Sequence, residues 1–203
     1  MQTAKEYVKH DLLRAAEELF FRKGYLGVSM REVATRSGVG LSNIYNYFSS
    51  KDELFRRVAS PATTGIETML ERHHGRSGHD ILDMCSDEYG REVVREYTDF
   101  ICRNRRALTI LLLRAEGSSL AGYKENFIKH ATLTVREYFD EMKRRHPGIR
   151  TDISDFSIQV HTVWIFSMFE EIITRDIGVE DIPKVVNEYI TIEISGWRKL
   201  MKI

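Results

Sequence analysis

Apolar residues recur at steps of three and four along most of this 203-residue chain, and this spacing limits its fold more than any other feature. Such a stripe is the pattern of an amphipathic helix. No segment keeps the alternation of every second residue that marks a half-buried strand. The chain also holds only three prolines, which favours long helices. The sequence therefore predicts an all-α fold of about nine helices.

Glycines, caps and apolar stripes set the expected helix boundaries. Gly24 and Gly38 suit helix ends, because glycine adopts the left-handed backbone that often follows a last turn. Two Ser-x-x-Glu patterns, which begin at Ser29 and at Ser50, are capping boxes in which each side chain satisfies a free backbone N–H. Helices are expected at residues 5–23, 29–37, 41–47, from 51 onward, 89–101, 106–113, 120–145, 154–175 and 182–201.

Composition and charge narrow the class of protein. The hydrophobic content of 42% is enough for a substantial core, and the formal net charge is zero. Residues 1–58 carry 10 Lys and Arg against 7 Asp and Glu, whereas residues 59–203 carry 20 against 23. The first part of the chain can therefore bind a polyanion, although the whole molecule has no basic excess.

The remaining composition bears on the compartment. Cys85 and Cys102 lie in apolar helical patterns, so we expect inert buried thiols and a reducing environment. The N-terminus has no apolar signal-peptide core, and the densest apolar run, LTILLL, is much shorter than a membrane span. We expect a soluble, cytoplasmic protein that contacts no membrane.

Residues 30–47 have the pattern of a helix-turn-helix, with two short helices joined by a glycine-containing turn. Ala34 is small where the two helices approach, Gly38 permits the tight turn, and Ile44 points back to lock the pair. We expect Val33, Val39 and Phe48 to fill the small core beneath. A generic three-helix packing unit with an exposed polar helix is the alternative interpretation.

The polar face of this motif suits contact with DNA. Asparagine can hydrogen-bond adenine edges in the major groove, while Ser, Tyr and Lys can reach phosphate oxygens. Helix N-termini add N–H groups that favour anions, so Ser29 and Ser50 can both cap and contact phosphate. The candidate DNA-binding residues are Ser29, Arg31, Leu41, Ser42, Asn43, Tyr45, Asn46, Tyr47 and Lys51.

The segment "LLRAAEELFFRKGYLGVSMREVATRSGVGLSNIYNYFSSKDELF" resembles the N-terminal domain of the TetR family of bacterial transcriptional regulators (TetR/AcrR-like). The similarity covers about residues 8–56 and includes "ELF…GY", "SMREVA", "SGV" and "IYNYFSSKDEL". It implies a homodimer, palindromic operator DNA, and a C-terminal domain whose small ligand releases the protein from DNA. By position, it implies phosphate contacts from Ser29, Tyr45, Tyr47 and Lys51, and base-facing roles for Ser42, Asn43 and Asn46.

These observations predict two domains with different functions. Residues 1–50 would form the helix-turn-helix DNA-binding domain, and residues 51–203 a helical domain for ligand binding and dimerisation. The expected cavity-lining residues, which suit an apolar or aromatic ligand, are Met69, Phe100, Leu112, Tyr123, Phe127 and His161, with Tyr123 and His161 as polar handles. The expected dimer-interface residues are Phe156, Val163, Trp164, Phe169, Val185, Tyr189, Ile192 and Trp197.

Other functions receive less support from the sequence. His73, His74 and His79 could bind a transition metal, but the segment lacks a clear ligand spacing and is expected to be a solvated loop. No phosphate-binding glycine motif, nucleophile elbow or metal-hydrolase spacing is present, so we expect neither an enzyme nor a cofactor. A repressor is expected; a ligand-independent regulator or interaction module and a transcriptional activator remain open.

Overall fold

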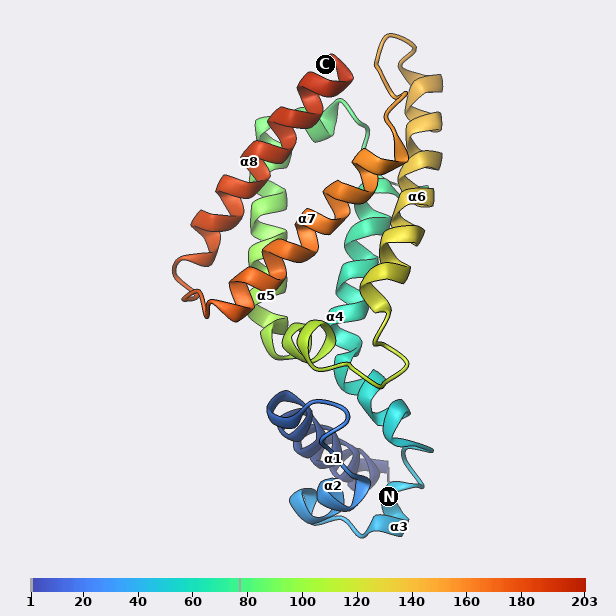
Figure 1. Cartoon of the computed structure of the whole chain (residues 1–203), viewed down its shortest axis with the longest axis vertical. Coiled ribbons are helices and arrows are strands. Elements are labelled where there is room, and N and C mark those ends of the chain that lie inside the picture. Colours follow the sequence, from blue (N-terminus) through green and yellow to red (C-terminus); the bar gives the residue numbers. More distant parts are fainter. Residues whose placement is uncertain (1, 77) are drawn as a thin grey trace. The chain divides into compact units, whose positions relative to one another are not determined.

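The computed structural model describes residues 2–76 and 78–203, and it consists of helices with their connecting segments (Figure 1). The described residues contain eight α-helices and one short 3-10 helix, and no strand. The helices are α1 (Gln2–Lys23), α2 (Met30–Ser37), α3 (Leu41–Ile44), α4 (Lys51–His74), η1 (Asp83–Cys85), α5 (Asp87–Leu113), α6 (Tyr123–Arg145), α7 (Asp155–Thr174) and α8 (Ile182–Met201). The all-α prediction is therefore confirmed.

Three expected boundaries were wrong. The two helices expected at residues 89–101 and 106–113 form the single helix α5, because no glycine or proline separates them. Helix α3 ends at Ile44, and the three residues that follow form a turn. Helix α6 begins at Tyr123 rather than at residue 120, since the preceding segment is anchored elsewhere: Asp52 accepts hydrogen bonds from the N–H and hydroxyl of Ser119 at 2.8 and 2.7 Å.

The chain divides into two compact units. Unit 1 comprises the described residues of Met1–Thr64 together with Asn104–Tyr123, and unit 2 comprises Gly65–Arg103 and Lys124–Ile203. The first part of α4 therefore belongs with the N-terminal helices, which differs from a boundary after residue 50. The reason is that Leu54 and Phe55 of α4 are fully buried in the core of unit 1.

Unit 1 is held by a small aromatic core. The ring of Phe55 packs edge-on against Phe20 at a centroid distance of 4.9 Å and against Tyr25 at 5.2 Å. Edge-to-face pairs of this kind add stability beyond their buried area. Val33 of α2 and Ile44 of α3 are also fully buried, so the helix-turn-helix shares this core.

Unit 2 is a helical bundle in which aromatic contacts join α5, α6, α7 and α8. Phe127 of α6 packs on Phe166 of α7 at 5.5 Å, and Phe169 of α7 packs near Tyr97 of α5 at 5.9 Å. The ring of Trp197 in α8 lies 6.2 Å from that of Phe139 in α6. The rings that make these contacts line a cavity inside unit 2.

Gly65 allows α4 and α5 to approach each other closely within unit 2. A Cβ atom at this position would lie 2.2 Å from a ring carbon of Phe100. Glycine is therefore required here by space and not by backbone conformation.

In the part of the chain that the structure describes, no helix is both long enough and apolar enough to cross a membrane.

Candidate functional site

The turn of the helix-turn-helix has the geometry that its sequence predicts. Gly38 ends α2 with φ of 71°, in the left-handed region where an L side chain would be strained. Ile44 is fully buried and locks α3 against the other helices, as expected. Phe48 is buried too, but Val39 and Ala34 are only half-buried.

The N-terminus of α2 has a complete capping box. The Glu32 N–H donates to Ser29 Oγ at 3.2 Å, and the Ser29 N–H donates to Glu32 Oε2 at 2.8 Å. Lys23 at the end of α1 donates to the other carboxylate oxygen at 2.7 Å. The hydrogen bonds from Lys23 and from Ser29 lower the pKa of Glu32 to about 2. The Glu32 carboxylate therefore joins the start of α2 to the end of α1.

The second capping box is shared between two serines. The Glu53 N–H donates to Ser50 Oγ at 3.0 Å, as expected. The Glu53 carboxylate, however, accepts from the N–H of Ser49 at 2.7 Å rather than from that of Ser50. Only one half of the expected reciprocal capping box is present, because the backbone N–H that reaches the Glu53 carboxylate belongs to Ser49, one residue before Ser50.

The outward face of α3 and its following turn is polar and open. Ser42, Asn43, Tyr45 and Asn46 are exposed, whereas Leu41 and Tyr47 are half-buried. Asn46 Nδ2 donates to Asn43 Oδ1 at 3.1 Å, so the two amides hold each other on this face. We call these six residues the α3 face. Arg31 and Ser29 at the start of α2 are also exposed.

Lys51 has a structural role that its position in the sequence did not indicate. Its ammonium donates to the carbonyl oxygens of Tyr25 at 2.9 Å and of Val28 at 3.0 Å. It also lies over the Tyr25 ring, 4.0 Å from the centroid. Lys51 thus ties the connection between α1 and α2 to the start of α4, and a role in phosphate contact stays a prediction.

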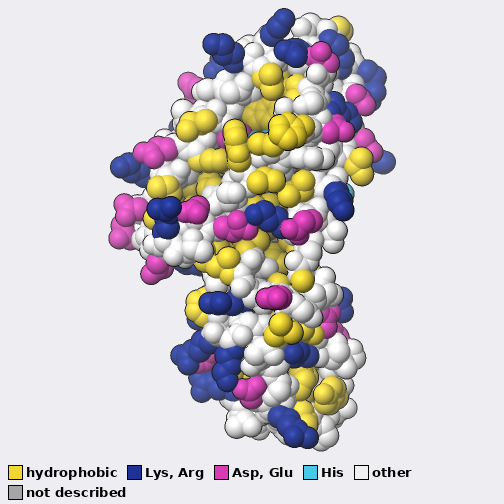
Figure 2. Space-filling model, in the orientation of Figure 1, with side chains coloured by type: hydrophobic (Ala, Val, Ile, Leu, Met, Phe, Trp, Pro, Cys, Tyr) yellow, Lys and Arg dark blue, Asp and Glu magenta, His cyan; other side chains and the backbone are white. Residues whose placement is uncertain are grey.

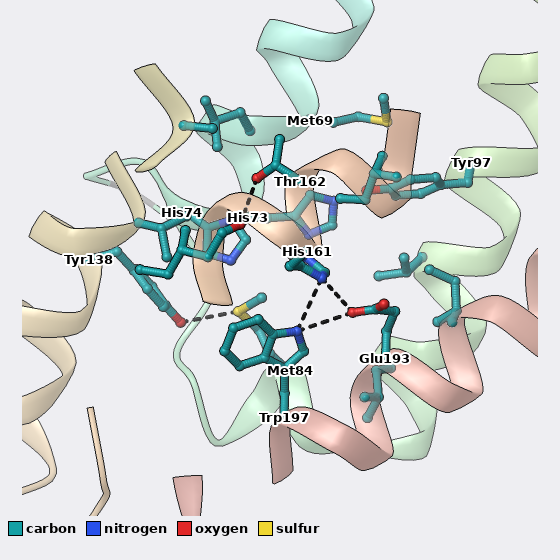
Figure 3. Close-up of a pocket in the computed structure, with 18 of the residues that line it drawn as sticks. Met69, His73, His74, Met84, Tyr97, Tyr138, His161, Thr162, Glu193 and Trp197 are labelled. Atoms are coloured by element: carbon teal, nitrogen blue, oxygen red, sulfur yellow. Dashed lines mark hydrogen bonds and ion pairs between the residues drawn. The ribbon is translucent and has the colours of Figure 1, made fainter. Parts of the chain in front are cut away.

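Unit 2 contains a cavity of about 170 Å³, shown in Figure 3. Side chains from α4, α5, α6, α7, α8 and the η1 segment line it, and most are aliphatic or aromatic. A cavity of ~150 Å³ is enough for a benzene-sized molecule. The cavity is therefore a candidate ligand site of modest size.

Half of the residues expected to line a cavity do so. Met69, Phe127 and His161 line it, and their contact with a ligand stays a prediction. Phe100 does not, because it packs on Gly65 and Phe169.

Leu112 and Tyr123 belong to unit 1 and do not line this cavity, so the prediction that they do was wrong. The Tyr123 hydroxyl donates instead to the carbonyl oxygen of Thr63 at 3.4 Å.

A polar cluster that sequence reasoning missed lies on the cavity wall. Glu193 contacts His161 Nδ1, and its Oε2 accepts from the indole N–H of Trp197 at 3.2 Å (Figure 3). Glu193 is 8% exposed although it is an acid. It stands in the apolar stripe of α8 with Ile190 and Trp197, and an acid at a core position of an amphipathic helix was the signal that could have found it.

The histidine segment is not the solvated loop that was expected, because His73 and His74 belong to α4. His73 is buried; its Nε2 pairs with Glu96 at 2.7 Å and its Nδ1 contacts the Tyr89 hydroxyl. Burial first, and then the charges of His73 and His161, lower the pKa of His74 to about 3. Among the described residues, no group of three or more His, Cys, Asp or Glu side chains could hold a metal ion; Ser77 lies outside them.

The expected dimer-interface residues separate into two sets. Phe156, Val163, Trp164 and Ile192 are exposed apolar residues of α7 and α8, and Val185 is half-buried. Figure 2 shows hydrophobic side chains gathered on the surface in the region of α7 and α8.

The other expected interface residues face inward. Phe169 is 1% exposed and packs on Tyr97 and Phe166, so it is a core residue, and its assignment to an interface was wrong. Tyr189 and Trp197 line the cavity.

Residues 12–58 match the model of the bacterial regulatory proteins of the tetR family. This N-terminal part of the chain belongs to the tetR family. An HTH-type transcriptional repressor from Mycobacterium tuberculosis is 31% identical over 99 residues, which covers 49% of this chain and 51% of that protein. The chain thus spans about half the length of the curated relatives that it matches.

Solved structures share the fold along most of the chain. The regulator FadR of Bacillus subtilis, in complex with stearoyl-CoA, has a TM-score of 0.64 at 14% identity and covers 93% of this chain and 98% of its own. The TetR-family member SCO3833 of Streptomyces coelicolor has a TM-score of 0.61 at 22% identity, with coverages of 91% and 90%. These likenesses show that the TetR fold extends through both units.

Proposed function

We propose that this chain is a transcriptional regulator that binds palindromic operator DNA as a homodimer through unit 1. We further propose that it acts as a cytoplasmic repressor, released from DNA when a small apolar or aromatic ligand occupies the cavity of unit 2. On this proposal the protein is a binding protein and not an enzyme. Membership of the TetR family supports the regulatory role.

The α3 face is the observation that carries the DNA-binding proposal. Four of its polar residues are exposed on α3 and the turn that follows it, and the buried Ile44 packs this helix against the core of unit 1. Asn43 and Asn46 supply amides that can read base edges, while Ser42, Tyr45 and Tyr47 supply hydroxyls for phosphates or bases. At the start of α2, the exposed Arg31 adds a guanidinium that suits a phosphate, next to the exposed Ser29.

The exposed apolar residues of α7 and α8 support the homodimer. Phe156 is 73% exposed, Trp164 53% and Ile192 68%, and large apolar groups in one region commonly mark an interface. Two linked recognition helices would then address two half-sites about 34–36 Å apart on one face of the duplex. Palindromic DNA follows from that symmetry.

The cavity supports control by a ligand over the ligand-independent alternative. It lies entirely among residues of unit 2 and is largely apolar. FadR, which shares the fold, is solved with stearoyl-CoA, so this fold can hold a ligand that has a long apolar chain. A ligand shifts DNA affinity only to the extent that it prefers the non-binding state: about 5.5 kcal/mol of preference moves a population from 99:1 to 1:99.

The test is selection of operator DNA from a random library with the full-length protein, followed by gel shift. We expect a palindromic consensus bound by two protomers. A triple variant with Ser42, Asn43 and Asn46 changed to alanine should lose this selectivity. Failure to enrich any sequence would contradict the proposal. Placing the selected site inside or upstream of a reporter promoter separates a repressor from an activator.

A further inference from the structure

The cavity of unit 2 contains a buried carboxylate oxygen that the protein does not use. Glu193 is 8% exposed and lines the cavity. Its Oε2 contacts His161 Nδ1 and accepts from the Trp197 indole N–H, whereas its Oε1 is buried without a hydrogen-bond partner among the described residues. A buried acceptor left unpaired carries the full cost of its desolvation, so this atom has a strong preference for a donor.

The surroundings of Glu193 also favour a positive charge. The rings of Trp197, Tyr97 and Tyr189 line the same cavity, and aromatic faces attract cations, especially where water is excluded. The Tyr189 hydroxyl is also buried and lies near the Glu193 carboxylate, without a hydrogen bond of ordinary geometry between them. Burial and the neighbouring Glu193 carboxylate raise the pKa of Tyr189, so this hydroxyl keeps its proton.

The cavity has little to offer an anion. No Lys or Arg stands among its described lining residues. His74 has its pKa lowered to about 3 by burial, which leaves a neutral imidazole at physiological pH. The other two histidines of the lining, His73 and His161, already face the carboxylates of Glu96 and Glu193. A carboxylate or phosphate head would therefore meet the charge of Glu193 with no Lys or Arg in the described lining to pair with it, and burying an unpaired charge is costly.

We propose that the effector of this protein is an apolar or aromatic molecule with a cationic amine head, which donates to Glu193 Oε1 while its body fills the apolar part of the cavity. This inference rests on the proposed ligand control, and it names the chemical class of the ligand. The cavity of about 170 Å³ suits a body of one ring or a short alkyl chain.

Three probes with the same ring and different heads test the inference. Phenethylamine, phenethyl alcohol and phenylacetate are titrated into the full-length protein by calorimetry, without DNA. We expect the amine to bind most tightly and the carboxylate most weakly. In the Glu193→Gln variant the amine should lose roughly tenfold or more in affinity, because a charge-assisted hydrogen bond becomes a neutral one. The alcohol should change much less.

The variant pair has a matched control. Glu188→Gln removes an exposed acid from the same helix, and it should leave all three affinities unchanged. Glutamine at position 193 can still accept from Trp197, so the fold should persist. If that variant fails to fold, thermal unfolding of the wild-type protein with each probe gives the same comparison, since only a bound probe raises the Tm.

The outcomes separate this inference from the proposed function. Equal binding of the three probes, or equal amine binding by wild-type and Glu193→Gln protein, would overturn the choice of an amine and leave ligand control standing. Absence of binding by any probe would overturn the inference as well. Neither result bears on DNA binding, which the operator selection measures independently.

Discussion

Asn46 Nδ2 donates a hydrogen bond to Asn43 Oδ1 at 3.1 Å on the exposed α3 face, so these amides are already paired in the absence of DNA. This pair fixes the direction of each amide. It leaves the second Asn46 N–H and the Asn43 NH₂ group available as donors. The two residues therefore present one shared hydrogen-bonding pattern rather than two independent ones.

We expect Asn43→Ala and Asn46→Ala each to relax sequence preference at one base pair, by about 1–3 kcal/mol if the contact is bidentate. The double variant should cost less than the sum of the two, because each residue orients the other. Gel shifts over a set of base-substituted operators measure this. Asn187→Ala, which removes an exposed amide from α8, is the control. Additive losses would contradict the pairing.

Lys51→Ala should act mainly through stability. Its ammonium donates to two carbonyl oxygens, and hydrogen bonds to charged groups contribute about 1.5–3 kcal/mol each in favourable cases. We expect a lower Tm and weaker binding to every DNA sequence, with the dependence of affinity on salt unchanged. A salt slope smaller by roughly 1, with the Tm unaffected, would show instead that Lys51 contacts a phosphate.

Local sequence signals predicted unit 1 well because its structure depends on local chemistry. Gly38 in the turn, Ser29 before α2 and buried Ile44 each follow from a rule that spans a few residues. Lys51 escaped these rules, since its partners Tyr25 and Val28 lie 26 and 23 positions earlier in the chain. No periodicity reports such a contact.

Unit 2 was harder to predict because an apolar stripe on a helix does not show whether it faces the core, a cavity or the surface. Phe169 and Trp164 are both large and apolar on α7, yet one is 1% exposed and the other 53%. Leu112 and Phe100 lie on one continuous helix, but its two ends belong to different units. Only tertiary contacts decide between core, cavity and surface, and the buried acid Glu193 was the one clue left in the sequence.

The Glu32 carboxylate should make the stability of unit 1 depend on acid pH. Its pKa is lowered from 4.5 to about 2 by Lys23 and Ser29, so the charged form is favoured in the folded state. The stabilisation is fully present above pH 4.5, and it is lost as the pH falls towards 2. We therefore expect wild-type protein to exceed Glu32→Gln in Tm at pH 6, with the difference shrinking through that window. A constant difference would refute the assignment.

Ser29→Ala tests the other half of the same capping box. The hydroxyl satisfies the Glu32 N–H at 3.2 Å, and loss of an N-cap typically costs about 1 kcal/mol. We expect chemical denaturation to show this loss, and DNA binding to weaken further if the hydroxyl also meets a phosphate. Ser29→Asp restores the cap and places a negative charge there. It should recover stability while binding DNA less well than the wild type.

Trp164 and Phe169 separate dimerisation from folding, because they lie on the same helix with opposite exposure. Phe169→Ala should lower the free energy of unfolding by about 3–5 kcal/mol, because it leaves a cavity in the core. This loss should not depend on protein concentration, as it would if the variant acted by dissociating a dimer.

Trp164→Glu should leave the fold of a protomer intact, since the side chain is 53% exposed, but place a charge in the proposed interface. Sedimentation should then show monomers for Trp164→Glu and dimers for the wild type. DNA carrying both half-sites should lose affinity with the dimer, whereas single half-sites should not. A wild-type monomer at micromolar concentration, or a Trp164→Glu variant that remains dimeric, would move the interface away from this face of α7.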